Sequence, residues 1–407
     1  MPVKPLAPDA VTVWESTDPE TQYSCSPGVC RLENGRLVAT FGIRGPGARD
    51  LPGATCELKG GKWASQGQVV TSDDGGITWQ HRARFPFRHA RPFATGTGLY
   101  ILGHDNDLMV MRSDDGGDTW GAPVRLTEGE VWHQAPCNTL QANGCVYLVM
   151  EKRISFDVRA WPVSEFAPVL MRGPLDADLT DVESWTFASE LSFRAAAPDP
   201  ENGTAFDWFG VPFYQAPYPR GVTPVERRNC APLGWLETNV VQFTDPGHIW
   251  TDPEGCTFHL WMRAHTGGVG YAAVAKVVEE RPGAGAMHTR LETVPSGRRA
   301  LFLPCPGGQM KFHILYDEPS ERYWLLGTQA TDSMRAIEKL PRDRYNLPNN
   351  QRSRLQLHFS RNCVDWCFAG LVDAGRTELE SRHYAATTVN GDDLVVLSRS
   401  ADHRAKS

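Results

Sequence analysis

One pattern recurs six times along the 407-residue chain, and it restricts the possible folds more than any other feature. The pattern is an apolar strand, a tight turn and a second apolar strand, as in VCRLENGRLVATF (29–41). Asn-Gly pairs at several of the turns supply the positive φ angles that two-residue hairpin turns require. Each copy therefore predicts an antiparallel hairpin. The other copies are at 91–103, 137–150, 249–263, 313–327 and 384–399.

An eight-residue turn also occurs twice, as SDDGGITW (72–79) and SDDGGDTW (113–120). Each follows an apolar run, so each predicts a third strand, a turn and the start of a fourth strand. Weaker versions occur at 356–366 and 181–191. An aspartate in such a turn can accept hydrogen bonds from nearby N–H groups, and the glycines permit positive φ. We therefore interpret these turn residues as structural and not catalytic: Ser72, Asp73, Asp74, Asp114 and Asp115.

Hairpins followed by third and fourth strands, with almost no helical periodicity, predict an all-β fold. The expected architecture is a six-bladed β-propeller of four-stranded antiparallel blades. The last hairpin has little chain after it, so VTVWES (11–16) is expected to complete the sixth blade and close the ring. No linker divides the sequence, which predicts a single domain over 1–407 with insertions at about 193–235 and 328–353.

Composition excludes several functional classes. A net charge of −7 argues against a nucleic-acid partner. No stretch approaches the roughly 18 apolar residues of a membrane span. The N-terminus shows no signal-peptide pattern, so a cytoplasmic location is expected as the sequence is written, or a periplasmic or secreted one if a leader was removed. The ten cysteines contain no CxxC pair, which favours free, buried thiols. No cofactor or metal is predicted.

Strand order locates a candidate site. In a four-stranded meander, the start of strand one and the end of strand two lie at the same end of the blade, opposite the SDDGG turns. We call this end the mouth. Five of the twelve histidines are expected there, among arginines and carboxylates that indicate a functional pocket. The first insertion adds aromatic residues, Trp208 among them, of the kind that stack on sugar rings. Further residues expected at the mouth include Gln134, Glu151 and Arg399.

The blade pattern and the two SDDGG turns resemble the Asp-box (BNR) repeats of the sialidase superfamily. Sialidases of that fold use an arginine triad to hold the substrate carboxylate, a tyrosine nucleophile paired with a glutamate, and an aspartate as acid and base. The resemblance implies that Glu237 in WLETNVVQF is that glutamate, Arg263 a triad arginine and Tyr384 the nucleophile. Arg44 resembles a further arginine of the family that contacts substrate.

The sequence also departs from the sialidase pattern. Cys25-Ser26-Pro27 stands where the first triad arginine is expected, and 60–70 contains no carboxylate for the acid/base role. The prediction is therefore a sialidase-like glycoside hydrolase that removes a terminal sugar from a glycan but is not an ordinary sialidase. Tyr384 and Glu237 carry the chemistry, and the proton donor is one of Asp50, His104, Asp105 and His133. The predicted substrate-binding residues are Arg44, Arg91, Arg263, His265, Gln309, Lys311, His383 and Trp208.

Three other functions stay open. A polysaccharide lyase acting on uronic acids by β-elimination would use histidine and tyrosine as proton-transfer groups and arginines to neutralise the carboxylate. A metal site could form if two or three of the mouth histidines converge. A carbohydrate-binding propeller without chemistry is the third, and it predicts that Glu237, Arg263 and Tyr384 stay apart. The lyase would use His133, His383, Tyr384, Arg91 and Arg263, and the metal site would draw on His89, His104, His133, His265 and His383.

Overall fold

The computed structural model describes residues 4–158, 161–197, 234–265, 270–332, 339 and 351–404. Within these ranges almost all of the regular secondary structure is β-strand. The helical segments described are α1 (Phe193–Ala196), η1 (Pro46–Asp50) and η2 (Val182–Ser184). No helix of this part of the chain is long and apolar enough to cross a membrane.

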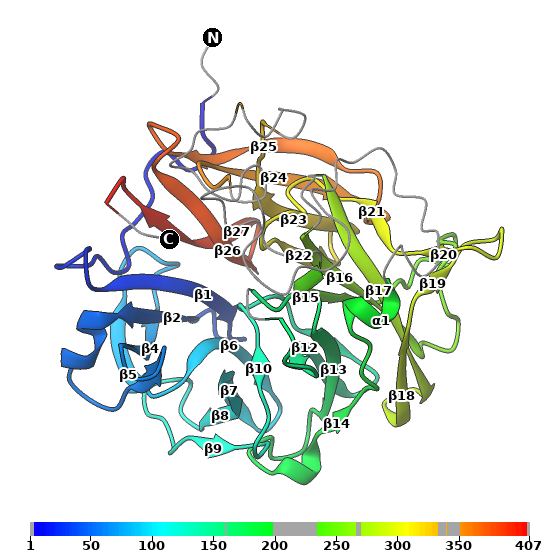
Figure 1. The fold of residues 1–407 in the computed structure, drawn as a ribbon, viewed down its shortest axis with the longest axis horizontal. Helices are drawn as coiled ribbons and strands as arrows, with labels where there is room; N and C mark the ends of the chain where they lie inside the picture. Colours follow the sequence, from blue (N-terminus) through cyan, green and yellow to red (C-terminus); the bar gives the residue numbers. More distant parts are fainter. Residues whose placement is uncertain are drawn as a thin grey trace.

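Five antiparallel sheets of four or five strands form blades around a common centre (Figure 1). Blade 1 contains β1 (Tyr23–Arg31), β2 (Leu37–Gly45), β3 (Cys56–Leu58), β4 (Trp63–Ser72) and β5 (Gln80–Phe85). Blade 2 contains β6 (Arg88–Thr95), β7 (Gly98–Asp105), β8 (Asp107–Ser113) and β9 (Val124–Arg125). Blade 3 contains β10 (Trp132–His133), β11 (Leu140–Ala142), β12 (Cys145–Arg153), β13 (Phe166–Pro174) and β14 (Thr186–Phe187).

The second half of the chain forms the other two blades. Blade 4 contains β15 (Gly234–Val241), β16 (Thr257–His265), β17 (Tyr271–Arg281), β18 (Ala284–Arg290) and β21 (Phe302–Pro304). Blade 5 contains β22 (His313–Asp317), β23 (Arg322–Thr328), β24 (Arg354–Ser360) and β25 (Cys367–Ala374). A separate small sheet pairs β19 (Glu292–Thr293) with β20 (Arg299–Ala300).

A two-stranded hairpin takes the remaining place in the ring. It consists of β26 (Ser381–Asn390) and β27 (Asp393–Ala401), and β26 packs against β1 on one side and against blade 5 on the other (Figure 1). The all-β propeller is thus confirmed, but the prediction of six four-stranded blades is wrong, because the described residues contain five blades and this hairpin. The ring is closed by the packing of β26 on β1.

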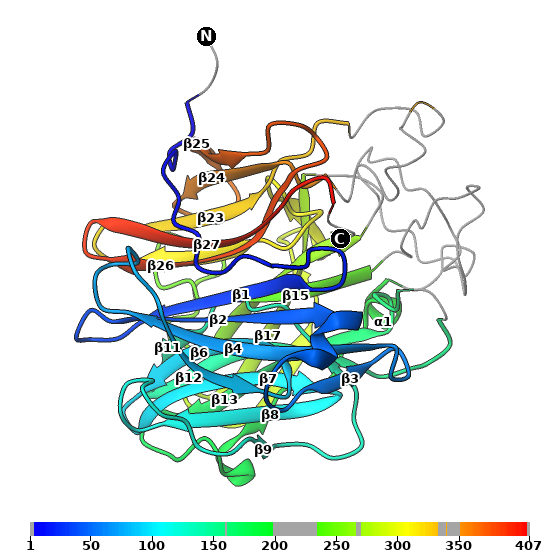
Figure 2. The ribbon, with the colours of Figure 1, turned by 90° about the vertical axis from the view of Figure 1, so that its left-hand side faces the viewer.

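The expected N-terminal strand at 11–16 is also wrong, because these residues form no strand. The chain just before them bonds instead to the outer strand of blade 5 (Figure 2). The Leu6 N–H donates to the Leu371 carbonyl at 2.7 Å, and the Ala7 N–H donates to the Val372 carbonyl at 3.1 Å. An outer strand presents unpaired backbone groups, and the N-terminal segment satisfies those of β25.

Five of the six predicted hairpins are present, and the fourth begins earlier than expected. Its first strand is β15, so 249–256 lie in the connection to β16 and not in a strand. The reason is local, because the Asp252 carboxylate accepts hydrogen bonds from the N–H groups of Glu254 at 3.0 Å and Cys256 at 3.1 Å. An aspartate that bonds to its own backbone in this way favours a turn over a strand.

The core lies between neighbouring sheets. An apolar cluster fills each of the six contacts around the ring, which include the two contacts of the hairpin. Burying one large apolar side chain stabilises a fold by about 1.5–3 kcal/mol, so these clusters supply the main force that holds the ring closed. Representative residues in ring order are Ile101, Leu148, Phe258, Phe312, Leu357 and Ala386.

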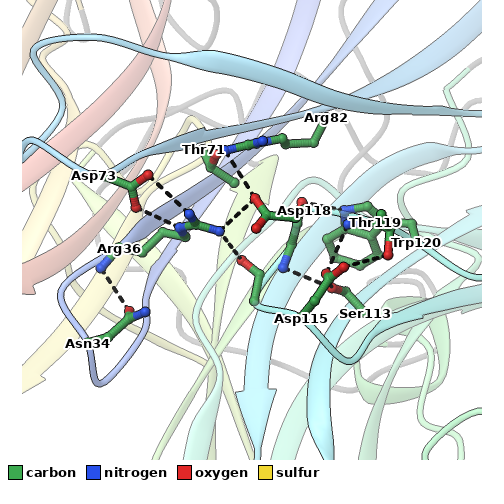
Figure 3. A network of polar contacts seen from close by, with 12 residues as sticks. Asn34, Arg36, Thr71, Asp73, Arg82, Ser113, Asp115, Asp118, Thr119 and Trp120 are labelled. Atoms are coloured by element: carbon green, nitrogen blue, oxygen red, sulfur yellow. Dashed lines mark hydrogen bonds and ion pairs between the residues drawn. The ribbon is translucent and has the colours of Figure 1, made fainter.

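The two SDDGG turns hold themselves together through their own side chains. In the second turn, the Asp115 carboxylate accepts from the Thr119 N–H at 2.9 Å and from the Ser113 hydroxyl at 2.8 Å. The first turn repeats these contacts. Arg36 links the two turns, because its guanidinium donates to Asp73 at 2.6 Å and to Asp118 at 2.8 Å (Figure 3). These carboxylates hold turns and join blades 1 and 2.

The prediction of free thiols is confirmed for the nine cysteines that the structure describes. Seven of the nine are buried, as expected for cysteines in apolar strands. Cys230 lies outside the described residues.

Candidate active site

The mouth is built from one structural irregularity that recurs around the ring. In β1, β6, β15 and β26 the pairing shifts so that two residues face one residue of the next strand, which is a β-bulge. The first residue of each bulge has a left-handed backbone although none is glycine. These residues are Ser26 (φ 42°), His89 (φ 53°), Glu237 (φ 58°) and Tyr384 (φ 53°). Such conformations cost about 1–3 kcal/mol each and cluster at functional sites.

The second strand of each unit supplies a partner at a matching position. The residue paired just before the bulge is His104 in β7, Arg263 in β16 and Arg399 in β27. In blade 3, Glu151 of β12 pairs with His133 just before the first strand is interrupted. Antiparallel pairing therefore brings one bulge residue and one strand-two residue from each unit to the same end of the ring.

Glu237, Arg263 and Tyr384 meet at this end. The Arg263 Nη1 lies 3.1 Å from Glu237 Oε2 and 3.1 Å from the Tyr384 hydroxyl. The Arg263 Nε donates to the Gln309 carbonyl at 2.8 Å, which fixes the plane of the guanidinium. Burial and then the charge of Glu237 raise the pKa of Tyr384, so the phenol is protonated at rest. The arrangement places a carboxylate and a phenol on one buried guanidinium.

More arginines surround Tyr384 than the sequence indicated. The Arg352 guanidinium lies 5.8 Å from the centre of the Tyr384 ring, and its Nη1 lies 3.1 Å from His383 Nε2. Burial and then the charge of Arg44 lower the pKa of Arg399 to about 10. The sequence reasoning missed Arg352 because it lies in the second insertion, outside every repeat. Arg399 was expected at the mouth without a role, although its pairing with His383 follows from the last hairpin.

Three of the five mouth histidines converge between blades 2 and 3. The ring centres of His89, His104 and His133 are 5.3–5.7 Å apart, and His89 Nδ1 lies 3.4 Å from His104 Nε2. Burial, reinforced by neighbouring positive charge such as that of Arg88, holds the pKa of all three imidazoles well below the ordinary histidine value. The three rings are therefore neutral at physiological pH.

The predicted proton donors occupy different environments. Asp50 is exposed at the end of η1. Asp105 ends β7, is partly buried, and lies 3.6 Å from the Arg88 guanidinium. Burial raises the pKa of Asp105, an effect that the Arg88 charge only partly offsets. His104 and His133 belong to the neutral histidine cluster, so neither holds a proton to donate at neutral pH.

Several predicted substrate-binding residues already have protein partners. Arg91 is buried and donates to the Val149 carbonyl at 3.1 Å. The buried Lys311 ammonium donates to a backbone carbonyl of β26, and burial lowers the pKa of Lys311 to about 8. The Gln309 side chain donates to the Thr328 carbonyl at 2.9 Å. These side chains brace neighbouring strands.

The other predicted residues are placed as follows. His265 is buried, and neither of its ring nitrogens has a hydrogen-bond partner among the described residues. The Arg44 Nε is likewise buried without a partner in the described part of the chain. His383 is buried against Arg352. Trp208 lies outside the described residues.

Glu151 is a buried carboxyl group beside the site to which sequence reasoning gave no role. Its Oε1 accepts from the Thr238 N–H at 3.0 Å and the Thr238 hydroxyl at 2.7 Å. Burial raises the pKa of Glu151 to about 8, with a further contribution from the Glu237 charge. Glu151 is therefore largely protonated at neutral pH. The only sequence signal for it was its position directly after the third predicted hairpin, which placed it at the mouth.

Comparisons with known proteins identify no family. No family model matches the chain, and no curated protein matches it. A solved structure of a protein of unknown function from Dyadobacter fermentans is 13% identical, with 94% of each chain covered and a TM-score of 0.50. The α-L-arabinofuranosidase Arb93A from Fusarium graminearum is 10% identical, with 94% of this chain and 88% of that chain covered and a TM-score of 0.46. A Trypanosoma rangeli sialidase is 13% identical, with 95% and 54% covered and a TM-score of 0.48.

Proposed function

We propose that the protein is a glycoside hydrolase that removes a terminal acidic sugar from a glycan, with Tyr384 as nucleophile. One observation carries the proposal, namely that the Arg263 guanidinium contacts both Glu237 and Tyr384 at 3.1 Å. A base beside a hydroxyl group is the arrangement that activates a side-chain nucleophile. A non-catalytic binding propeller gives no reason for these three groups to meet, two of them, Glu237 and Tyr384, with a left-handed backbone.

In the proposed reaction, the Tyr384 oxygen attacks the anomeric carbon while its proton passes to Glu237. The bond from that carbon to the leaving oxygen breaks, and the leaving oxygen receives a proton. Water then attacks the anomeric carbon and gives one proton to the group that protonated the leaving oxygen, the bond to Tyr384 breaks, and the phenolate recovers its proton from Glu237. Two displacements at one carbon retain its configuration. Because burial and the Glu237 charge raise the pKa of Tyr384, the base is required for this attack.

Asp105 is the proposed proton donor to the leaving oxygen. A general acid must hold its proton near neutral pH, and burial raises the pKa of Asp105. Asp50 is exposed to solvent and has no comparable environment. Because the imidazoles of His104 and His133 are neutral, neither ring has the imidazolium proton that a general acid would donate.

An acidic sugar is proposed because positive charge gathers around Tyr384. The positive charges of Arg263, Arg352 and Arg399 all interact electrostatically with its phenol, and Arg263 also contacts it directly. The Arg44 charge also lowers the pKa of Arg399, which shows that these cations repel one another. A substrate carboxylate would relieve that repulsion and bind through charge-assisted hydrogen bonds.

β-Elimination of a uronic acid is the second candidate, and the neutral histidines favour it. A lyase needs a base that is unprotonated at neutral pH, and the pKa of His133 lies at about 3 because of burial and the Arg88 charge. His133 also lies near enough to Arg263 for that charge to lower its pKa. The same arginines would neutralise the uronate carboxylate.

A panel of acidic glycans incubated in water enriched in heavy oxygen separates the two candidates. Hydrolysis places the heavy oxygen on the new reducing end, whereas elimination yields an unlabelled product with a double bond. Tyr384→Phe is expected to abolish the labelled product, and Tyr316→Phe, at a partly exposed tyrosine of β22, is the matched control. Labelled product at an unchanged rate in Tyr384→Phe would exclude the proposed nucleophile. An unlabelled, unsaturated product would show that the reaction is elimination and not hydrolysis.

A further inference from the structure

His89, His104 and His133 form a compact triangle that the proposed hydrolysis does not use. The candidate ligand nitrogens of the three rings all lie within 4.8 Å of one another. They come from two blades, since His89 and His104 face each other across the β6 bulge and His133 ends β10. No short sequence motif unites them, so the triangle exists only because blades 2 and 3 pack side by side.

The spacing between the nitrogens of His89 and His104 fits metal coordination and is long for a hydrogen bond. Zinc binds imidazole nitrogens at about 2.0–2.1 Å, which in a tetrahedron separates two ligand nitrogens by roughly 3.4 Å. The His89 Nδ1 to His104 Nε2 distance is 3.4 Å. A direct N–H to nitrogen hydrogen bond would be shorter, at about 3.0 Å. The ligand atom of the third ring, His133, lies within 4.8 Å of the other two.

The cluster carries unsatisfied polar groups and backbone strain. His104 is 1% exposed, and its Nδ1 has no hydrogen-bond partner in the described residues. His89 holds a left-handed backbone with φ 53°. The His133 ring is stacked on Phe166 with an interplanar angle of 7°, so its orientation is constrained.

The surroundings of the cluster are charged. Arg88, whose charge acts on His104 and His133, lies 3.6 Å from Asp105, and the charges of Arg44 and Arg263 also act on His133. His89 and His133 are partly exposed residues.

We propose that His89, His104 and His133 bind one divalent transition-metal ion, with Zn²⁺ the best match to three imidazole ligands. Three protein ligands leave a coordination position for water or for a substrate oxygen. The inference goes beyond the proposed hydrolysis and does not depend on it, because it assigns the cluster to metal binding and not to proton transfer.

Metal titration of the full chain tests the inference without any glycan. After chelator treatment and dialysis, Zn²⁺ alone is expected to bind at one ion per chain with a dissociation constant of about 1 µM or tighter by calorimetry. Co²⁺ alone is expected to give the strong visible absorption of a four-coordinate site. His104→Asn should weaken Zn²⁺ binding by roughly 100-fold or more, since one of three ligands is lost.

His358→Asn is the matched control, because His358 is also a buried histidine whose Nδ1 has no partner among the described residues. It should bind Zn²⁺ as the unaltered protein does. If circular dichroism shows that His104→Asn is unfolded, His133→Gln takes its place at a less buried position. Failure of the unaltered protein to bind Zn²⁺ or Co²⁺ at about 100 µM, or binding that survives both ligand substitutions, would overturn the proposal.

Discussion

Replacing Glu151 with glutamine is expected to stabilise the protein, and more so as the pH rises. The Glu151 side chain is fully buried, and its Oε2 has no hydrogen-bond partner in the described residues. Burial raises the pKa of Glu151 to about 8, so the folded protein keeps the carboxyl protonated at neutral pH. Glutamine has the same shape as the protonated acid, retains the oxygen that accepts from Thr238, and does not titrate.

The magnitude follows from the difference between folded and unfolded pKa values. A glutamate in an unfolded chain has a pKa of about 4.3. Because the folded pKa of Glu151 is higher, proton binding stabilises the fold fully below about pH 4.3, and this contribution is lost as the pH rises towards about 8. The loss is about 1 kcal/mol at pH 5 and about 4–5 kcal/mol at pH 8. The advantage of Glu151→Gln should therefore grow by about 3–4 kcal/mol between these pH values.

Urea unfolding of both proteins at pH 5 and pH 8 measures this growth, and titrating groups that do not interact with Glu151 cancel in the comparison. Glu165→Gln serves as a contrast, because the buried Glu165 carboxylate lies 2.8 Å from the Arg153 guanidinium. Removing that charge leaves a guanidinium without its partner and should lower stability at both pH values. The reasoning fails if the free energies of unfolding of the Glu151→Gln and unaltered proteins change with pH in parallel.

Three further predictions concern stability and are tested by urea unfolding at neutral pH. Gly67→Ala would place its Cβ 1.8 Å from the buried Phe85 ring, so it should cost about 3 kcal/mol or more, and a loss below 1 kcal/mol would contradict the described packing. Arg36→Ala removes the link between the SDDGG turns and should cost about 1–2 kcal/mol, a loss that shrinks at high salt. Tyr147→Phe deletes a 3.0 Å hydrogen bond to the buried Glu279 carboxylate and should cost about 1.5–3 kcal/mol, whereas an unchanged midpoint would show that water replaces the hydroxyl.

The parts of the fold that depend on neighbouring residues could be predicted from the sequence. The SDDGG turns form as expected because their internal contacts, such as that from the Thr119 N–H to Asp115, join residues at most four apart. Hairpins with short turns are predictable for the same reason. The fourth hairpin shows the limit, because the backbone bonds of Asp252 make a turn where apolar residues suggested a strand.

Strand order also placed Glu237, Arg263 and Tyr384 at one end of the ring, because antiparallel pairing determines which ends of neighbouring strands lie together. Their direct contact could not be derived from the sequence in this way. It requires β15, β16 and β26 to converge on one axis, and the bulges that turn Glu237 and Tyr384 inward have no distinctive sequence pattern.

The sequence by itself determined the β-hairpins, the turns and the end of the ring at which polar residues gather. Those features depend on backbone hydrogen bonds and φ preferences over a few residues. Only the tertiary structure decided the blade count, the convergence of Arg352 on Tyr384 and the triangle of His89, His104 and His133. These features depend on how apolar faces of separate sheets pack against one another, and that free energy is shared by residues far apart in the chain.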